Sequence, residues 1–264
     1  MSRIAALPMY DFPHLRPHTD GLWQSIRSEF QKIGFESEHA LNRDLSPALL
    51  WAHPNLGFTQ TCGLPYVNGL RGNATLIGTP DYGIHPGKPG WYNSVIIARQ
   101  SDKRMALAEF VGAEFAYNGA NSQSGLFAIM FELQDSHGNA RFFGSCVKSG
   151  GHALSVKAVA EGRADIAAID AVTWRYLQQS APETSQLKVL HATAPSPGLP
   201  YISGKPERSF PLADAVEVAI KNLPDAHKNA LGLKGFWRAK PEDYDIIAAR
   251  AKLAAPIMAA HGIS

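Results

Sequence analysis

The chain has 264 residues, and 25 lysines and arginines against 23 aspartates and glutamates leave a formal charge of +2. Hydrophobic residues make up 45% and charged residues 18%, so the chain can bury a core and is not a disordered polyelectrolyte. The near-neutral charge argues against nucleic acid as the main partner, because a duplex binder needs a basic face. The two cysteines, Cys62 and Cys146, exclude a disulfide scaffold and a four-cysteine zinc site, and no run approaches the roughly 18 apolar residues of a membrane span.

Short apolar runs alternate with helical patterns along the chain. A strand is expected over 4–7, and Thr19 or Asp20 can begin a helix whose apolar stripe comprises Leu22, Trp23, Ile26, Phe30 and Ile33. Ser46-Pro47 indicates a further helix start, and strands follow over 74–78 and 94–99. We then expect helices over 103–111, 124–134, 152–161 and 171–179, with strands over 114–117, 141–147, 165–169 and 187–192. The last quarter is mostly helical, over 211–222, 225–231 and 241–261.

Strands separated by helices are typical of parallel βαβ units, so the predicted fold class is α/β. Two segments rich in proline and glycine, 85–90 and 195–200, break the pattern. Both are compatible with ordinary surface loops. The alternative is that they are crossings between two lobes, one formed by 1–90 plus 195–264 and the other by 91–194. A cleft between such lobes is the default place for a ligand.

The most informative motif is the segment 117–125, Tyr-Asn-Gly-Ala-Asn-Ser-Gln-Ser-Gly, which follows one predicted strand and opens a helix. The free amides of a first helical turn and the helix dipole make an anion site, and Ser122 and Ser124 would add hydroxyls. Ordinary N-capping by Ser122 or Asn121 is the competing interpretation.

Two other turns have the same character. The segment 148–155 also follows a strand and opens a helix, with His152 as a hydrogen-bond donor, although a glycine-rich turn with an exposed histidine would look alike. The segment 60–66 presents Thr61 and Cys62 at a strand end. A nucleophilic Cys62 is not supported, because no histidine or aspartate lies near it in sequence.

Asp165 and Asp170 flank one predicted strand, and Asp170 can bind a ligand group, cap the following helix, or do both. The ten histidines show no metal-binding spacing, and the glycine-rich nucleotide motifs are absent, so no metal and no cofactor is expected.

Taken in order, several segments resemble the phosphate/phosphonate-type (PhnD-like) substrate-binding proteins of ABC transporters. The matching segments are 7–11, 60–66, 78–82, 92–94, 122–125, 151–152, 159–170 and 195–201. The resemblance implies a type 2 periplasmic-binding-protein fold, with two lobes, each a mostly parallel sheet flanked by helices, two crossover segments and a closing cleft. It also implies a ligand site formed by Tyr10, Thr61, Cys62, Tyr92, Ser122, Gln123, Ser124, Gly125, His152 and Asp170. Gly151 stands where that family usually has serine.

The start of the chain, Met1-Ser2-Arg3, is followed by only four apolar residues before Pro8, which does not match an export signal. The sequence therefore predicts a cytoplasmic protein as written, and a periplasmic one if the chain is a processed form. The expected partners are a small anion and an ABC transporter permease, with no nucleic acid and no membrane-spanning segment of its own.

The favoured hypothesis is a non-catalytic binding protein for phosphate, phosphite or a phosphonate-like anion. The first alternative is a cytoplasmic enzyme on the same fold, suggested by Cys62, His152 and Asp170. The second is a cytosolic sensor that passes its ligand state to a protein partner.

Overall fold

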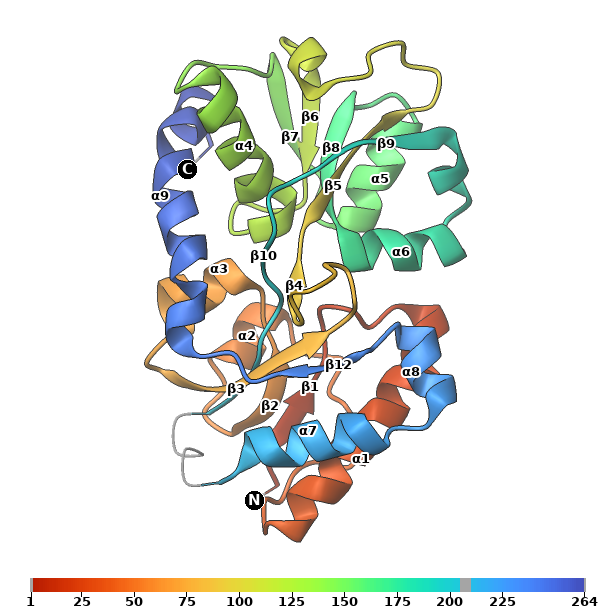
Figure 1. The fold of residues 1–264 in the computed structure, drawn as a ribbon, viewed down its shortest axis with the longest axis vertical. Coiled ribbons are helices and arrows are strands. Elements are labelled where there is room, and N and C mark those ends of the chain that lie inside the picture. The colour runs from red at the N-terminus through yellow and green to blue at the C-terminus, as the bar shows by residue number, and fades with distance from the viewer. Residues whose placement is uncertain (1, 205–209, 264) are drawn as a thin grey trace. The chain divides into compact units, whose positions relative to one another are not determined.

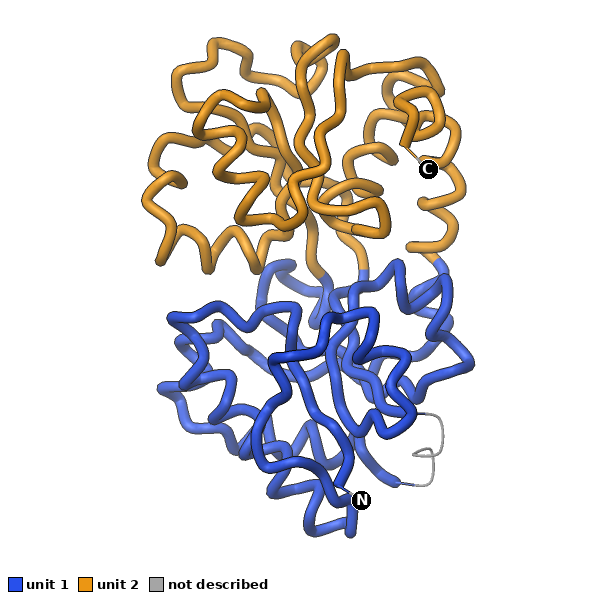
Figure 2. Tube along the Cα trace, turned by 180° about the vertical axis from the view of Figure 1, so that it is seen from behind, with its two compact units in different colours: residues 1–91, 197–245 blue, residues 92–196, 246–264 orange. Residues whose placement is uncertain are grey.

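The chain forms two compact units in a computed structural model that describes residues 2–204 and 210–263 (Figure 2). Unit 1 comprises residues 1–91 and 197–245, and unit 2 comprises residues 92–196 and 246–264. The chain therefore passes between the units at three points, whereas the sequence analysis expected two crossings and assigned residues 195–264 to the first lobe. The difference lies in helix α9 (Asp245–Ala260), because its Ala254, Ile257 and Met258 belong to the hydrophobic core of unit 2.

Unit 1 has a five-stranded sheet in the order β1-β2-β11-β3-β12. Its strands are β1 (Ile4–Ala6), β2 (Leu56–Gln60), β3 (Ala74–Asp81), β11 (Tyr201–Gly204) and β12 (Gly235–Trp237). Its helices are α1 (Arg16–Lys32), α2 (Pro47–Trp51), α3 (Gly63–Pro65), α7 (Leu212–Asn222) and α8 (Asp225–Leu231). Helix α1 begins four residues before Asp20 and buries the expected stripe except Ile33, which is its half-buried C-cap. The ring of Trp23 stacks on Phe58 of β2 at 5.6 Å.

Unit 2 has a second five-stranded sheet, in the order β7-β6-β8-β5-β9 (Figure 1). Its strands are β5 (Ser94–Arg99), β6 (Glu114–Tyr117), β7 (Ser145–Lys148), β8 (Ile166–Asp170) and β9 (Leu187–Ala192). Its helices are α4 (Ala128–His137), α5 (His152–Ala160) and α6 (Ala171–Ser180), together with the part of α9 after Asp245. Helices α4 and α9 lie on one side of this sheet, and α5 and α6 lie on the other.

The sheets are mixed rather than mostly parallel. In unit 1, β1 runs parallel to β2, but β11 is antiparallel to both β2 and β3, and β12 is antiparallel to β3. In unit 2, β6 is parallel to β7 and β8, while β5 is antiparallel to β8 and β9. The antiparallel β5 and β11 each follow directly on a segment that has just crossed from the other unit, so they enter their sheets without a preceding crossover helix.

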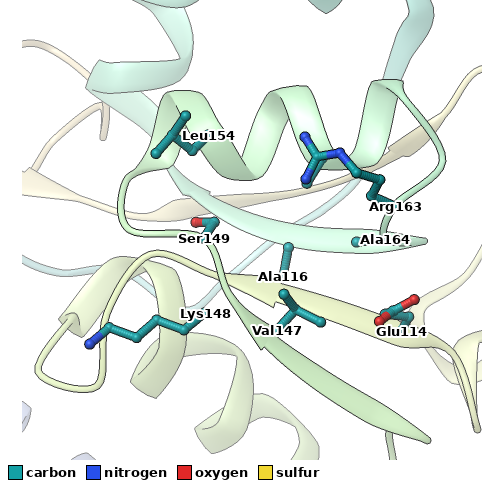
Figure 3. Close-up of a pocket in the computed structure, with 9 residues that line it drawn as sticks. Glu114, Ala116, Val147, Lys148, Ser149, Leu154, Arg163 and Ala164 are labelled. Carbon is teal, nitrogen blue, oxygen red and sulfur yellow. The ribbon is translucent and has the colours of Figure 1, made fainter.

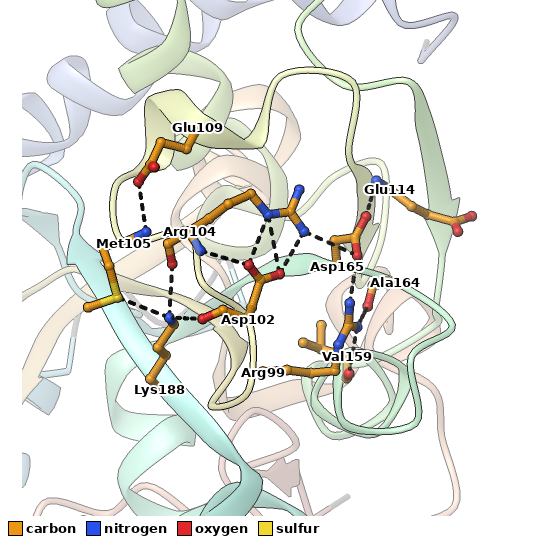
Figure 4. Close-up of polar contacts among 10 residues, drawn as sticks. All are labelled: Arg99, Asp102, Arg104, Met105, Glu109, Glu114, Val159, Ala164, Asp165 and Lys188. Carbon is orange, nitrogen blue, oxygen red and sulfur yellow. Dashed lines mark hydrogen bonds and ion pairs between the residues drawn. The ribbon is translucent and has the colours of Figure 1, made fainter.

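The helix expected over 103–111 is replaced by an extended loop and a short 3₁₀ turn, Leu107–Phe110. Figure 4 shows the hydrogen bonds and ion pairs that charged side chains make with this segment. Asp102 accepts hydrogen bonds from the amide and the guanidinium of Arg104, which lowers the pKa of Asp102 to about 2. Lys188 Nζ donates to the carbonyls of Asp102 and Arg104, and Glu109 accepts from the amides of Met105 and Ala106. These bonds engage backbone groups that a helix would need for itself.

Asp165 joins this network at the amino end of β8. Its carboxylate forms an ion pair with Arg99, with an N–O distance of 2.7 Å, and accepts the amide of Glu114 at 3.1 Å. Burial raises the pKa of Asp165, but the Glu114 amide and the two arginines together bring it below its ordinary value. Asp165 therefore stabilises the end of the sheet opposite to the ends where ligands bind in α/β folds.

Two short strands, β4 (Trp91–Tyr92) and β10 (Ser196–Pro197), pair where the chain passes from one unit to the other. Within residues 2–204 and 210–263, no helix combines the length and hydropathy that a membrane-spanning segment requires.

Candidate functional site

The carboxyl ends of three parallel strands, β6, β7 and β8, meet at one edge of the unit 2 sheet, where the antiparallel β5 begins. Each candidate segment of this unit follows one of those ends. The segment 118–125 follows β6, the segment 149–152 follows β7, and Asp170 ends β8 opposite Ser94 of β5. Open α/β sheets bind ligands at this edge, because loops and helix amino ends gather there.

A continuous helix begins at Gln123 with a π-helical turn, Gln123–Phe127, and continues as α4. The Ser122 hydroxyl accepts a hydrogen bond from the Gly125 amide at 3.0 Å, so the N-capping interpretation of Ser122 is confirmed. The first amides of a helix have no acceptor within the helix. Ser122 satisfies one of them, the amide of Gly125.

Ser124 and His152 are brought together from different turns. Ser124 is buried, and its Oγ lies 3.0 Å from His152 Nε2. Burial lowers the pKa of His152 to about 4, while a hydrogen bond to the backbone of Ala168 acts in the opposite, smaller sense. The imidazole is therefore neutral at pH 7, so this side chain brings hydrogen-bonding atoms to the site without a formal charge.

Gly125 is required by close approach rather than by its backbone angle. A Cβ atom at this position would lie 1.9 Å from Asn118 Oδ1 and 3.1 Å from His152 Cε1. Asn118 and the His152 ring therefore pack directly against the start of the helix, and they can do so because Gly125 has no side chain. Asn118 was not among the predicted site residues, although its place directly after β6 was a signal for it.

Two buried hydrogen bonds anchor this turn to the segments that lead into unit 1. Gln123 Nε2 donates to the Ser196 hydroxyl at 3.2 Å, and the Ser94 hydroxyl donates to the Ser124 carbonyl at 2.8 Å. Ser94 and Ser196 are buried and were not predicted. The Gln123 side chain thus holds the loop in place.

Asp170 and Tyr92 complete the unit 2 group. Asp170 is 1% exposed, and its Oδ1 accepts the amide of Thr173 at 2.8 Å as the N-cap of α6. The capping role proposed for it is therefore confirmed. Tyr92 is 3% exposed and lies in β4, two residues before Ser94.

The second turn, 149–152, differs from the first. Ser149 Oγ donates within its own loop and lies 2.7 Å from Ser155 Oγ, and Gly151 begins α5 without a side-chain cap. A groove of about 400 Å³ runs beside this turn, between α5 and the sheet (Figure 3). The groove is lined by the exposed Val147 and Leu154 and by the cations Lys148 and Arg163, and none of the predicted site residues lines it. Only His152 of this turn bonds to the 122–125 turn, so the pair does not form two equivalent anion sites.

The three predicted residues of unit 1 also follow strands with a common direction. Tyr10 follows β1 and makes an edge-to-face contact with Tyr82, which follows β3, at 5.1 Å between ring centroids. Thr61 is fully buried, and its hydroxyl donates to the Cys62 carbonyl at 3.3 Å. Cys62 is partly exposed at the start of α3. Within the part of the chain that the structure describes, no group of three or more histidine, cysteine or acidic residues could hold a metal ion.

The two mixed α/β sheets have the fold of type 2 periplasmic binding proteins, as the sequence predicted. A family model described as "ABC transporter, phosphonate, periplasmic substrate-binding protein" matches residues 56–244. This is more than half of the chain, and the protein belongs to that family. The resemblance noted in the sequence is confirmed, and so is a non-catalytic, solute-binding role, because the family consists of substrate-binding proteins.

Solved structures share the fold at low sequence identity. PhnD1 from Prochlorococcus marinus, solved with methylphosphonate, is 18% identical, with a TM-score of 0.74 and coverage of 97% of this chain and 99% of that one. The binding component PA3383 of an ABC phosphonate transporter from Pseudomonas aeruginosa is 16% identical, with a TM-score of 0.69 and coverage of 96% and 87%. XAC2383 from Xanthomonas citri, bound to ATP, is 15% identical, with a TM-score of 0.67 and coverage of 99% and 98%. A search of curated proteins found no match.

Proposed function

We propose that this protein captures a small oxyanion of the phosphonate, phosphite or phosphate type at the carboxyl edge of the unit 2 sheet. The observation that carries the proposal is the pairing of the buried Ser124 with a neutral His152, beside the amides of Gln123 and Ser124. The two amides supply directed hydrogen bonds to an anion that leaves water, and His152 fixes the Ser124 hydroxyl beside them.

The energetics support binding without any cation at this turn. A hydrogen bond to a charged group contributes about 1.5–3 kcal/mol net, and a helix amino end adds about 0.3–2 kcal/mol. Micromolar binding corresponds to about 8 kcal/mol, so several contacts of this kind must act together to offset the cost of immobilising a small ligand. The phosphonate-binding description of the family and the methylphosphonate ligand of the Prochlorococcus protein support the same ligand class.

Tyr10, Thr61, Cys62 and Tyr92 are proposed as further ligand contacts, together with Asp170 beyond its capping role. In the relatives a substrate-binding component serves an ABC transporter, and we propose that a permease of this type is the partner. The family is described as periplasmic, while the cytoplasmic location expected from the first residues stays a prediction. Fractionation of the native host with an antibody against this chain distinguishes the two compartments.

Calorimetric titration with methylphosphonate, phosphite, phosphate and sulfate tests the proposal, on protein unfolded and refolded to remove copurified ligand. At least one phosphorus oxyanion should bind with micromolar affinity, and Ser124→Ala should weaken it by about tenfold or more. Ser136→Ala is the matched control, because Ser136 lies exposed on α4 and its hydroxyl bonds to the Glu132 carbonyl in its own helix. Absence of binding at millimolar anion, or equal losses in both variants, would contradict the proposal.

A further inference from the structure

The hydroxyl of Ser124 has one proton, and the geometry determines where that proton points. A neutral imidazole carries hydrogen on one nitrogen only. His152 Nδ1 is buried without a hydrogen-bond partner of normal geometry, and the nearby backbone of Ala168 interacts favourably with a proton on the ring. A proton on Nδ1 faces this favourable backbone, whereas a bare Nδ1 would place a buried lone pair there. The favoured tautomer is therefore Nδ1–H, which leaves Nε2 as an acceptor.

An unprotonated Nε2 at 3.0 Å takes the hydroxyl hydrogen of Ser124. The serine oxygen then has only lone pairs left for a ligand. The absence of a side chain at Gly125 allows Asn118 and the His152 ring to pack against the helix start, which keeps His152 beside Ser124. Ser124 thus combines a backbone amide that donates with a side-chain oxygen that accepts.

We propose that Ser124 accepts a hydrogen bond from the ligand, so that the site selects oxyanions that retain an acidic proton. The inference rests on the proposed function and assigns it a narrower ligand class, the monoprotonated phosphonate or phosphate anion. A sulfate or a sulfonate keeps no proton near pH 7, and its oxygen would face the lone pairs of Ser124 with repulsion instead of a hydrogen bond.

The ligand's own ionisation gives the first test. A phosphorus oxyanion loses its second proton near neutral pH, so titrations with methylphosphonate from pH 6 to 9 change the ligand from the form that fits to the form that does not. The affinity should fall by about tenfold per pH unit once the second proton is lost. Methylsulfonate should bind at least about tenfold more weakly than methylphosphonate at pH 6, because it lacks the hydrogen that Ser124 accepts.

Methylsulfonate also controls for the protein, since it keeps one charge form across the range. The titratable groups at this edge are His152, Asp170 at the end of β8, Tyr92 in β4, Tyr117 at the end of β6 and Lys148 at the end of β7. An ionisation of any of these groups changes the affinity for both anions. The ratio of the methylphosphonate affinity to the methylsulfonate affinity therefore reports only the effect of the proton on the ligand. An affinity for methylphosphonate that rises with pH, or equal binding of the two anions, would overturn the inference.

Ser124→Ala separates the serine oxygen from the rest of the turn. The variant should reduce the preference for methylphosphonate over methylsulfonate toward one, while Ser136→Ala should keep it. A preference unchanged in Ser124→Ala would overturn the assignment to this oxygen.

The tautomer is measured without any ligand. Nitrogen-15 spectra of the histidines at pH 7 should show His152 with hydrogen on Nδ1 and none on Nε2, with His152→Gln identifying the signal. Hydrogen on Nε2 would overturn the inference while leaving the proposed function intact. If no oxyanion binds at any pH, the proposed function itself fails.

Discussion

The carboxyl edges of the two sheets are built from different chemistry. In unit 2 the edge is a connected set of polar groups, in which the buried Gln123 and Ser124 and the half-buried His152 bond to partners on other elements. In unit 1 the edge is aromatic, with the rings of Tyr10 and Tyr82 in contact.

The charges near the unit 1 edge are already paired with each other. Arg43 binds Asp11 at 2.6 Å and Asp20 at 2.7 Å, and these carboxylates raise the pKa of Arg43 above its ordinary value. The comparison supports the proposal that hydrogen-bond selection of the ligand resides in unit 2, whereas unit 1 presents rings and buried backbone. The following experiments challenge that division, beginning with the largest expected effect.

Gly125→Ala should abolish oxyanion binding, with a loss of at least about 100-fold. The added methyl would meet Asn118 and push the histidine ring away from Ser124. Gly151→Ala is the matched control, because a Cβ there meets nothing within 4 Å and the residue has an extended φ of −177°. Calorimetry on both variants, with circular dichroism to verify folding, makes the comparison. Similar losses at both glycines would show that the close approach at Gly125 is irrelevant.

Acid should destabilise the protein through His152. The pKa of this histidine is about 4 in the folded protein, against an ordinary value of 6.5 for the unfolded chain, so between those values the unfolded chain binds a proton that the folded chain does not. Stability is complete above pH 6.5 and falls as the pH decreases toward 4, by about 1.4 kcal/mol per unit and by roughly 2–3 kcal/mol in total.

Urea unfolding of wild type and His152→Gln at a series of pH values isolates this contribution. The difference between the two free energies of unfolding should shrink as the pH falls from 6.5 to 4. A difference that stays constant would mean that the histidine is charged, or exposed, in the folded protein.

The aromatic contact of unit 1 should appear as a pairwise energy. Tyr10→Leu and Tyr82→Leu, combined in a double-mutant cycle, should give a coupling of about 0.5–1.5 kcal/mol in the free energy of unfolding. The ratio of methylphosphonate to methylsulfonate affinity should not change in either variant, because that selection depends on unit 2. A changed ratio would place part of the selection in unit 1.

Gly151→Ser should produce the smallest effect on stability, a gain of a few tenths of a kcal/mol from the N-cap that α5 lacks. The added hydroxyl would stand next to His152 in the chain. Phosphate affinity, measured by calorimetry, should increase several-fold, while that of Gly151→Ala should stay as in wild type. No gain over the alanine variant would mean that this turn does not face the ligand.

The sequence was sufficient for the fold class and for the turns, because apolar periodicity and strand-to-helix junctions are local signals. Strand β9 and helix α8 were predicted at their observed limits, 187–192 and 225–231. Helix 103–111 was wrong, because the contacts that keep that segment extended come from Lys188, more than 80 residues later in the chain. The mixed direction of the sheets was also missed, since strand direction depends on where the chain enters each unit.

At the site, the sequence identified residue types but could not assign their partners. Ser122 and Asp170 were named as candidates for both binding and capping, and the structure adds the caps. Ser94 and Ser196 were not named as site residues, because they bond to the 123–124 turn from distant positions in the sequence. Asn118 was not named either, although it lies within the 117–125 motif and approaches Gly125 of the same motif. Whether each of the ten named residues touches a ligand stays a prediction.

The late return of α9 into unit 2 has a practical consequence for protein engineers. A gene fragment encoding residues 92–196 would lack Ala254, Ile257 and Met258, which fill part of that unit's interior, so it should yield an aggregation-prone product. A peptide covering 245–263, supplied in trans or joined through a designed linker, would be the missing piece, and its recruitment offers a split-protein assay for the folding of this half.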